Sequence, residues 1–221
     1  MGEESGATGF SSDYWNENYN ELELMDGIAN AKHHARYIKA VMALEAIDVS
    51  SVIDFGFGLG FMFKEVLHIF KPYRGFGLEP SQFAFDQVKK KKIAPVDSMN
   101  LKLHNIDLVT WAKDYALKQK KFDLGLCTSV FQYLTDEELD LVIPIMATGV
   151  NYLYFSVPTD LELKRQRLNL GFHDRFAIPR TKGHYRKLLK DHFTIVSSRL
   201  LESKCLVEES NSPFSELLFR F

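Results

Sequence analysis

One short stretch combines an acid with three glycines at alternate positions: Asp54, Gly56, Gly58 and Gly60. An apolar run precedes it, and apolar residues at helical spacing follow it as far as Pro72, which predicts a buried strand, a tight turn and a helix. Glycine leaves the backbone open to a ligand and permits positive φ, and the first turn of a helix offers unpaired N–H groups. The pattern therefore indicates a turn that binds a ligand.

The type of ligand follows from the residues beside the glycines. A dinucleotide site needs a small residue where this chain has Phe61. A carboxylate at Asp54 is unfavourable beside a pyrophosphate, but it suits a ligand with a cationic ammonium or sulfonium end. A strand–helix turn without any ligand is the alternative, and the acids that follow the later strands argue against it.

These residues also carry a resemblance to a known family. The pattern Asp54-x-Gly56-x-Gly58-x-Gly60 resembles the first signature of the class I S-adenosylmethionine-dependent methyltransferases, and the resemblance extends over about residues 28–221. It implies S-adenosylmethionine as the cofactor and S-adenosylhomocysteine as the product. It also implies an α/β fold: a doubly wound, mostly parallel seven-stranded sheet with an antiparallel last strand and helices on both faces.

The order of the predicted elements agrees with that fold class. Five predicted strands alternate with helices, which favours a parallel sheet covered by helices on both faces. They end near Asp54, Glu79, Asp107, Cys127 and Pro158. Two closing strands are expected at residues 193–197 and 215–221. Ligands of such sheets bind outside the carboxyl ends of the strands, so the acids at these ends are expected to converge on one site.

Two of these acids fit a nucleoside ligand. Glu79 ends the strand that follows the glycine turn, where a doubly wound fold places the acid that binds ribose hydroxyls. For Asp107 the resemblance implies a contact with the adenine amino group, while the N-cap of a helix that begins at Leu108 is the alternative. The cofactor-binding set that we expect is Asp54, Gly56, Phe57, Gly58, Gly60, Glu79, Pro80, Asp107, Leu108, Thr128 and Phe131.

The acceptor side of the site is less well defined. The resemblance places the loop after Cys127 beside the transferable methyl, with Gln132 and Tyr133 facing the acceptor and Tyr19 as a further contact. Methyl transfer is an in-line displacement at a sulfonium carbon, and it needs a base only when the acceptor must lose a proton. No catalytic residue is therefore identified, and the candidates are His173, Tyr133 and Tyr14.

The chain divides into a tail and one domain. Residues 1–27 are expected to form a tail with an aromatic segment, which is either a lid over the cofactor or a hydrophobic anchor on the domain. Residues 28–221 are expected to form the methyltransferase domain. Within it, residues 159–180 are expected to be a loop insertion on the substrate side, and its neighbouring His173 and Asp174 are either a base with its partner or part of an ordered loop.

Composition limits the partners. The chain has 221 residues and a formal net charge of −2, so no overall basic field favours nucleic acid or an anionic membrane. Its two cysteines, Cys127 and Cys205, form no disulfide framework or metal-ligand group; we expect no metal and a cytoplasmic location. We expect a small-molecule acceptor. A non-catalytic cofactor-binding partner subunit and a nicotinamide-dependent oxidoreductase are the alternatives, and the methylated atom and the oligomeric state stay open.

Overall fold

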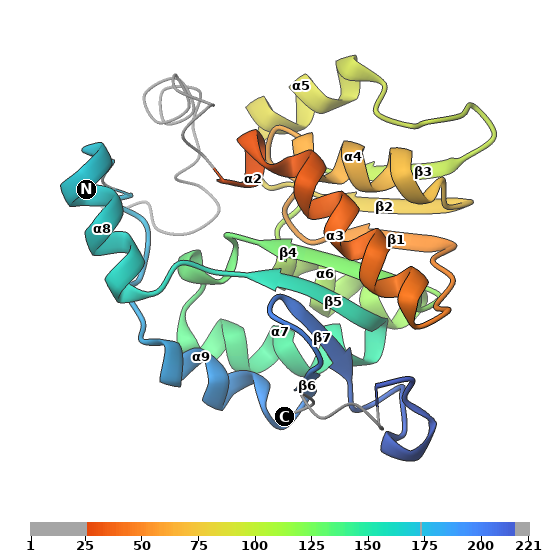
Figure 1. The fold of residues 1–221 in the computed structure, drawn as a ribbon. Coiled ribbons are helices and arrows are strands. Elements are labelled where there is room, and N and C mark those ends of the chain that lie inside the picture. The colour runs from red at the N-terminus through yellow and green to blue at the C-terminus, as the bar shows by residue number, and fades with distance from the viewer. Residues whose placement is uncertain (1–25, 173, 215–221) are drawn as a thin grey trace.

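The structure is a computed structural model that describes residues 26–172 and 174–214 (Figure 1). Its strands are β1 Ser51–Asp54, β2 Arg74–Leu78, β3 Asn100–His104, β4 Phe122–Thr128, β5 Val150–Ser156, β6 Phe193–Ile195 and β7 Leu200–Ser203. Its α-helices are α2 Asp26–Ala29, α3 Ala31–Leu44, α4 Phe61–Phe70, α5 Gln82–Lys91, α6 Leu108–Asp114, α7 Asp136–Gly149, α8 Asp160–Leu170 and α9 Lys182–Leu189. Short 3-10 turns lie at η3 Ala116–Lys118, η4 Phe131–Tyr133 and η5 Glu209–Asn211.

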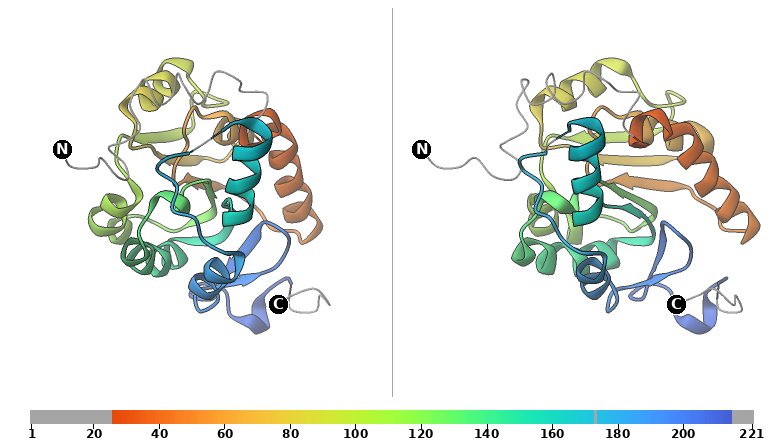
Figure 2. Two further views of the ribbon diagram at one scale, coloured as in Figure 1. Left: turned by 90° about the vertical axis from the view of Figure 1, so that its left-hand side faces the viewer. Right: turned by 60° about the vertical axis from the view of Figure 1, so that its left-hand side comes forward.

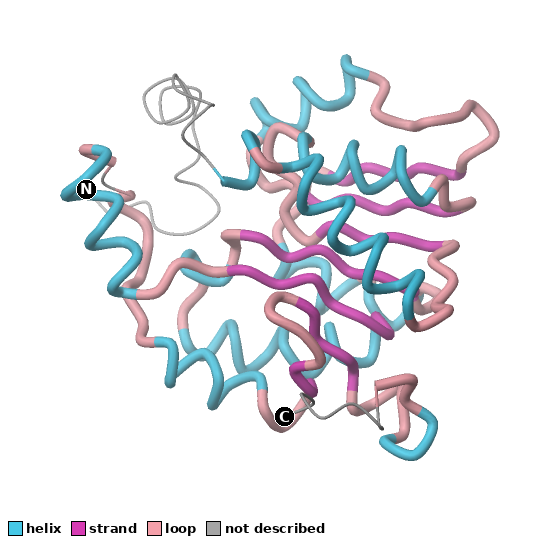
Figure 3. Tube along the Cα trace, viewed as in Figure 1, coloured by secondary structure: helices cyan, strands magenta, loops and turns pink. Residues whose placement is uncertain are grey.

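The strands form one seven-stranded sheet in the order β3-β2-β1-β4-β5-β7-β6 (Figure 3). Strands β1 to β5 pair in parallel, and β7 is antiparallel to both of its neighbours, β5 and β6. The order reverses between β1 and β4, which is the position where doubly wound sheets bind their ligands. The predicted fold class is confirmed.

Helices cover both faces of the sheet (Figure 2). Alternate residues of each strand point to opposite faces, so Val52 packs with the buried side chains of α3, α4 and α5, while Ile53 packs with those of α6, α7 and α9. The start of α7 has a capping box, in which Thr135 and Glu138 exchange hydrogen bonds between side chain and backbone. None of the described helices is long and apolar enough to cross a membrane.

The end of the sheet differs from the sequence-based prediction. The antiparallel strand is β7 at residues 200–203, which were not predicted as a strand; the predicted strand at residues 215–221 lies outside the described residues. The sequence does not predict β7 because the polar residues Glu202 and Ser203 suggest a loop. In the structure both side chains are buried and hydrogen-bonded. Ser212 donates to Glu202 Oε1 at 2.7 Å, and Ser203 donates to the Ala147 carbonyl at 2.5 Å.

One further prediction fails in detail. Residues 159–180 were expected to be a loop, but they contain α8, which begins at the N-cap Thr159 and ends at Gly171 in the left-handed conformation. None of the residues of α8 is buried, so the apolar periodicity that marks a packed helix is missing from its sequence.

Candidate functional site

The turn between β1 and α4 requires glycine at specific positions. Gly60 is the N-cap of α4 with φ of 79°, a left-handed conformation that other residues rarely adopt. A Cβ atom at Gly60 would lie 2.8 Å from Val88 Cγ2, and one at Gly56 would lie 2.6 Å from Val130 Cγ2. The turn is therefore packed closely against α5 and against the loop after β4.

Two carboxylates lie buried at this turn. Asp54 at the end of β1 is 3% exposed, and Glu79, directly after β2, is 5% exposed. The Gly56 N–H donates to Asp54 Oδ1 at 3.1 Å and the Gly58 N–H donates to Glu79 Oε2 at 2.7 Å. Glu79 Oε1 accepts from the Ser81 N–H at 2.9 Å. Among the described residues, neither acid pairs with a lysine, arginine or histidine.

Burial without a cation changes the acidity of both groups. Burial raises the pKa of Asp54 to about 8; the Gly56 N–H opposes this rise, and the nearby charge of Glu79 adds to it. Burial also raises the pKa of Glu79 to about 7, against the hydrogen bonds from the Ser81 and Gly58 N–H groups. Without a ligand, the pair therefore holds protons near neutral pH, and a cationic partner would favour release of those protons.

The acid after β3 has a local role. Asp107 is the N-cap of α6: its Oδ1 accepts from the Thr110 N–H at 2.7 Å and its Oδ2 accepts from the Thr110 hydroxyl at 2.8 Å. The N-cap alternative is confirmed, and the adenine contact stays a prediction. The next residue, Leu108, is buried in the core. Asn105, which sequence reasoning missed, donates from Nδ2 to the carbonyls of Glu79 at 2.8 Å and Pro80 at 3.0 Å.

Three of the residues predicted to contact the cofactor are two buried aromatic residues and a threonine at a strand end. Phe57 is 6% exposed and stacks on Phe63 with the ring centroids 6.3 Å apart. Phe131 is 1% exposed and packs edge-on against Phe155 at 4.9 Å. Thr128 ends β4 beside β5. The two rings thus belong to the hydrophobic core, and their direct contact with a ligand stays a prediction.

Comparison with known proteins identifies the fold. The sequence matches no protein-family model and no curated protein. Among solved structures, an S-adenosylmethionine-dependent methyltransferase from Clostridium acetobutylicum superposes with a TM-score of 0.63 at 12% identity, covering 87% of this chain and 99% of the other. Magnesium protoporphyrin IX methyltransferase from Synechocystis, solved with its methyl donor bound, gives 0.55 at 15% identity, with coverages of 86% and 93%.

A third similar structure is the plantazolicin methyltransferase BpumL, solved with S-adenosylhomocysteine and a desmethyl substrate analogue. It superposes with a TM-score of 0.62 at 14% identity over 81% of this chain and 69% of the other. The chain has the class I methyltransferase fold. At these identities the likeness shows the fold alone. Asp54, Glu79 and Asp107 each lie at or just beyond the carboxyl end of a strand of this methyltransferase fold.

The expected acceptor residues are described only in part. Gln132 is 2% exposed, and its side-chain Oε1 is buried with no hydrogen-bond partner in the part of the chain that the structure describes. The Tyr133 hydroxyl donates to Asp174 Oδ2 at 2.6 Å, which links the loop after β4 to the segment between α8 and α9. Tyr14, Tyr19 and His173 lie outside the described residues. Within those residues, no group of three or more histidines, cysteines or acids is arranged to hold a metal ion.

Arg180 organises the neighbouring surface, and sequence reasoning missed it. Its Nε donates to Asp136 Oδ1 at 2.7 Å, and its guanidinium also donates to the carbonyls of Phe131 at 3.2 Å and Leu134 at 2.6 Å. Burial tends to raise the pKa of Asp136, but the hydrogen bond and charge of Arg180, with those of His184, lower it below its usual value.

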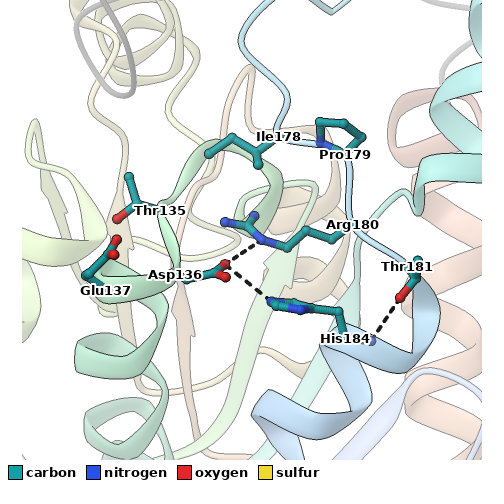
Figure 4. A pocket seen from close by; sticks show the side chains of 8 residues that line it. All are labelled: Thr135, Asp136, Glu137, Ile178, Pro179, Arg180, Thr181 and His184. Atoms are coloured by element: carbon teal, nitrogen blue, oxygen red, sulfur yellow. Dashed lines mark hydrogen bonds and ion pairs between the residues drawn. The ribbon is translucent and has the colours of Figure 1, made fainter.

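A shallow cavity of about 540 Å³ opens beside this ion pair (Figure 4). Its lining comes from the start of α7 and from the segment that leads into α9. The arginine has no signal in a single sequence, because its partners lie 44 to 49 positions away. It fixes the loop that carries Gln132. Ile178, which lines the cavity, donates its N–H to the Gln132 carbonyl at 2.7 Å, so the cavity lies beside that loop.

Proposed function

We propose that this protein is an S-adenosylmethionine-dependent methyltransferase that acts on a small molecule. The observation that carries the proposal is the pair of buried carboxylates, Asp54 and Glu79, which have no cationic partner among the described residues. A buried charge without a partner is strongly unfavourable. A ligand with hydroxyl donors and positive charge would satisfy both groups, so the residues present fit this cofactor.

Each residue then has a defined task. Glu79 accepts hydrogen bonds from ribose hydroxyls through the lone pairs that the Gly58 and Ser81 N–H groups leave available. Asp54 favours the cationic end of the ligand, and Gly56 to Gly60 let the backbone approach it. When bound, S-adenosylmethionine would supply a methyl group on a sulfonium, and the neutral thioether S-adenosylhomocysteine would be the leaving group. The protein's contribution is to hold the acceptor in line with that methyl and to exclude water.

The acceptor side is proposed from the loop after β4. The unpartnered Oε1 of Gln132 offers a hydrogen-bond acceptor to an N–H or O–H group of the substrate. The Tyr133 hydroxyl, already bonded to Asp174, positions this loop. A small-molecule acceptor is also in keeping with the net charge of −2. The free thiols of Cys127 and Cys205 fit a reducing compartment such as the cytoplasm.

Isothermal titration calorimetry with S-adenosylmethionine tests the proposal. We expect saturable one-site binding that Glu79→Gln weakens by tenfold to about 100-fold, because each hydrogen bond to a charged group contributes roughly 1.5–3 kcal/mol. Leu117→Gln, at a 91% exposed position in η3, is the matched control and should leave the affinity unchanged.

The same titration separates the proposal from its alternatives. Binding of NAD(H) in place of S-adenosylmethionine would favour the oxidoreductase. Binding of S-adenosylmethionine without turnover on any member of a broad acceptor panel would favour the non-catalytic partner subunit. No heat of binding at millimolar S-adenosylmethionine would end the proposal.

A further inference from the structure

Helix α8 presents an unusual face to solvent. It stands at the edge of the molecule, outside the two helical layers (Figures 1 and 2). Leu161, Lys164, Arg165 and Leu168 follow the i, i+3, i+4, i+7 spacing of one helix face, and the two leucines are 64% and 71% exposed. We call these four residues the α8 face. Two leucines this exposed beside two cations suggest a surface that binds a partner.

Three of the four residues of the α8 face belong to a basic part of an otherwise slightly acidic chain. From position 164 to position 190 the only acid is Asp174. The nine basic residues of this part are Lys164, Arg165, Arg167, Arg175, Arg180, Lys182, Arg186, Lys187 and Lys190. Arg165 of this face forms an ion pair with Glu162, Nη1 to Oε2 at 3.8 Å, which is solvent-exposed and contributes little. The partner of this face should therefore be acidic and carry apolar side chains.

The first 25 residues of the same chain have this composition. They contain six acids, Glu3, Glu4, Asp13, Glu17, Glu21 and Glu23, and no lysine or arginine. They also contain apolar and aromatic residues, Phe10, Tyr14, Trp15, Tyr19, Leu22 and Leu24. Charge and apolar content are thus both complementary to the α8 face.

The fold brings this segment within reach of α8. Helix α3 leads into the amino end of β1, so α2, which begins at Asp26, lies at the edge of the sheet where the parallel strands end. Helix α8 follows the carboxyl end of β5 and lies at the same edge (Figure 1). A chain of 25 residues spans up to about 80 Å when extended, and an 11-residue helix is only about 16 Å long.

We propose that residues 1–25 dock on the α8 face of the same chain. The acids pair with Lys164 and Arg165, and the apolar side chains cover Leu161 and Leu168. A tethered segment acts at an effective concentration in the millimolar range, which favours it over a second copy of the chain. The docking itself does not depend on the proposed enzymatic function.

Acrylamide quenching of tryptophan fluorescence in the full chain tests this proposal. The chain has two tryptophans, and Trp111 is only 1% exposed, so quenching reports mainly on Trp15. If the segment docks, the wild-type protein should show little quenching. The triple variant Lys164→Glu, Arg165→Glu, Leu168→Gln should raise the quenching constant about threefold, and high salt should raise it partly in the wild type.

The matched control changes an equally exposed group at the opposite edge of the sheet. Lys113→Glu, Leu117→Gln and Lys118→Glu alter the same charges and one leucine on α6 and η3, and should leave quenching unchanged. Circular dichroism checks that each variant is folded; Arg165→Glu alone is the milder substitute. Full quenching of Trp15 in the wild type, or protection that persists in the α8 variant, would overturn the proposal. Protection that grows with protein concentration would instead assign the face to a second copy.

Discussion

At the scale of single residues, the candidate site is defined by two carboxylic acids whose burial is energetically unfavourable. Asp54 and Glu79 lie buried at one turn of the chain, and burial raises the pKa of both. A pKa difference of one corresponds to about 1.4 kcal/mol between the two protonation states. The ligand-free protein therefore gives up stability at this position, which is typical of functional sites.

The first prediction concerns Asp54→Asn. With a pKa near 3.8 unfolded and about 8 folded, Asp54 keeps its proton in the folded state while the unfolded state loses it. The free energy of unfolding of the wild type therefore falls as pH rises from about 4 to about 8, because the folded state keeps the Asp54 proton that the unfolded state releases. The amide of the variant does not titrate, so the variant should gain up to a few kcal/mol over the wild type at pH 8 and less at pH 5. Urea unfolding at pH 5 and pH 8 measures the difference in stability between variant and wild type. An equal difference at both pH values would contradict a raised pKa for Asp54.

At the scale of elements, we expect the turn between β1 and α4 to affect both the stability of the fold and ligand binding. Gly60 combines positive φ with a Cβ direction that Val88 fills. Gly171, at the end of α8, has φ of 64°, but a Cβ atom there would have nothing within 4 Å. The two glycines therefore share the backbone requirement and differ in packing and in distance from the site.

The second prediction compares alanine at these glycines. Gly171→Ala should lose about 1–2 kcal/mol, the penalty of the left-handed conformation, and should bind S-adenosylmethionine as the wild type does. Gly60→Ala should lose more stability, because its methyl also displaces Val88, and its affinity should fall at least tenfold. Chemical unfolding and calorimetry give the two quantities. Equal losses in stability and affinity for both variants would show that packing at Gly60 is unimportant.

The sequence predicts the elements that follow simple periodicity and misses those that do not. Strands β1 to β5, and the positions of Asp54 and Glu79 at the ends of β1 and β2, follow from local pattern alone. Strand β7 is missed because half of it is polar and finds its partners only in the folded chain. Helix α8 is missed because no face of it is buried, so solvent and not packing sets its composition.

The residues that join distant segments are likewise invisible to local pattern. Arg180 and Gln132 acquire their surroundings only when the loop after β4 meets the segment before α9. The Ile178 N–H donates to the Gln132 carbonyl at 2.7 Å, a contact across 46 positions of sequence. No spacing rule connects positions that far apart, so contacts of this kind cannot be read from one sequence.

At the scale of the whole molecule, Arg180 ties the last third of the chain to the sheet. Its backbone carbonyl accepts from the Asp160 N–H at 2.8 Å at the base of α8, and its side chain holds η4 and the start of α7. The segment that carries α8 and the loop that carries Gln132 are thus fastened at one buried point. Any movement of α8 should pivot about this residue.

The third prediction is that Arg180→Ala destabilises the fold by about 2–3 kcal/mol, since it removes charged hydrogen bonds worth roughly 1.5–3 kcal/mol each that water only partly replaces. Arg180→Lys should be almost as strongly destabilised, because an ammonium cannot reproduce the forked hydrogen bonds of a guanidinium. His184→Ala removes the more exposed partner of Asp136. This variant is the control and should change stability by about 0.5 kcal/mol. Guanidinium unfolding compares the three, and a loss in His184→Ala as large as in Arg180→Ala would contradict this role.

The central claim is that the buried acids at the glycine turn hold the sugar and the cationic end of a sulfonium nucleoside. A crystal structure of the protein with S-adenosylhomocysteine tests it most directly. The account predicts both ribose hydroxyls within hydrogen-bond distance of the Glu79 carboxylate, and the amino-acid end of the ligand against the Gly56 to Gly60 backbone beside Asp54. A nucleoside bound elsewhere, or Glu79 turned away from the sugar, would contradict it.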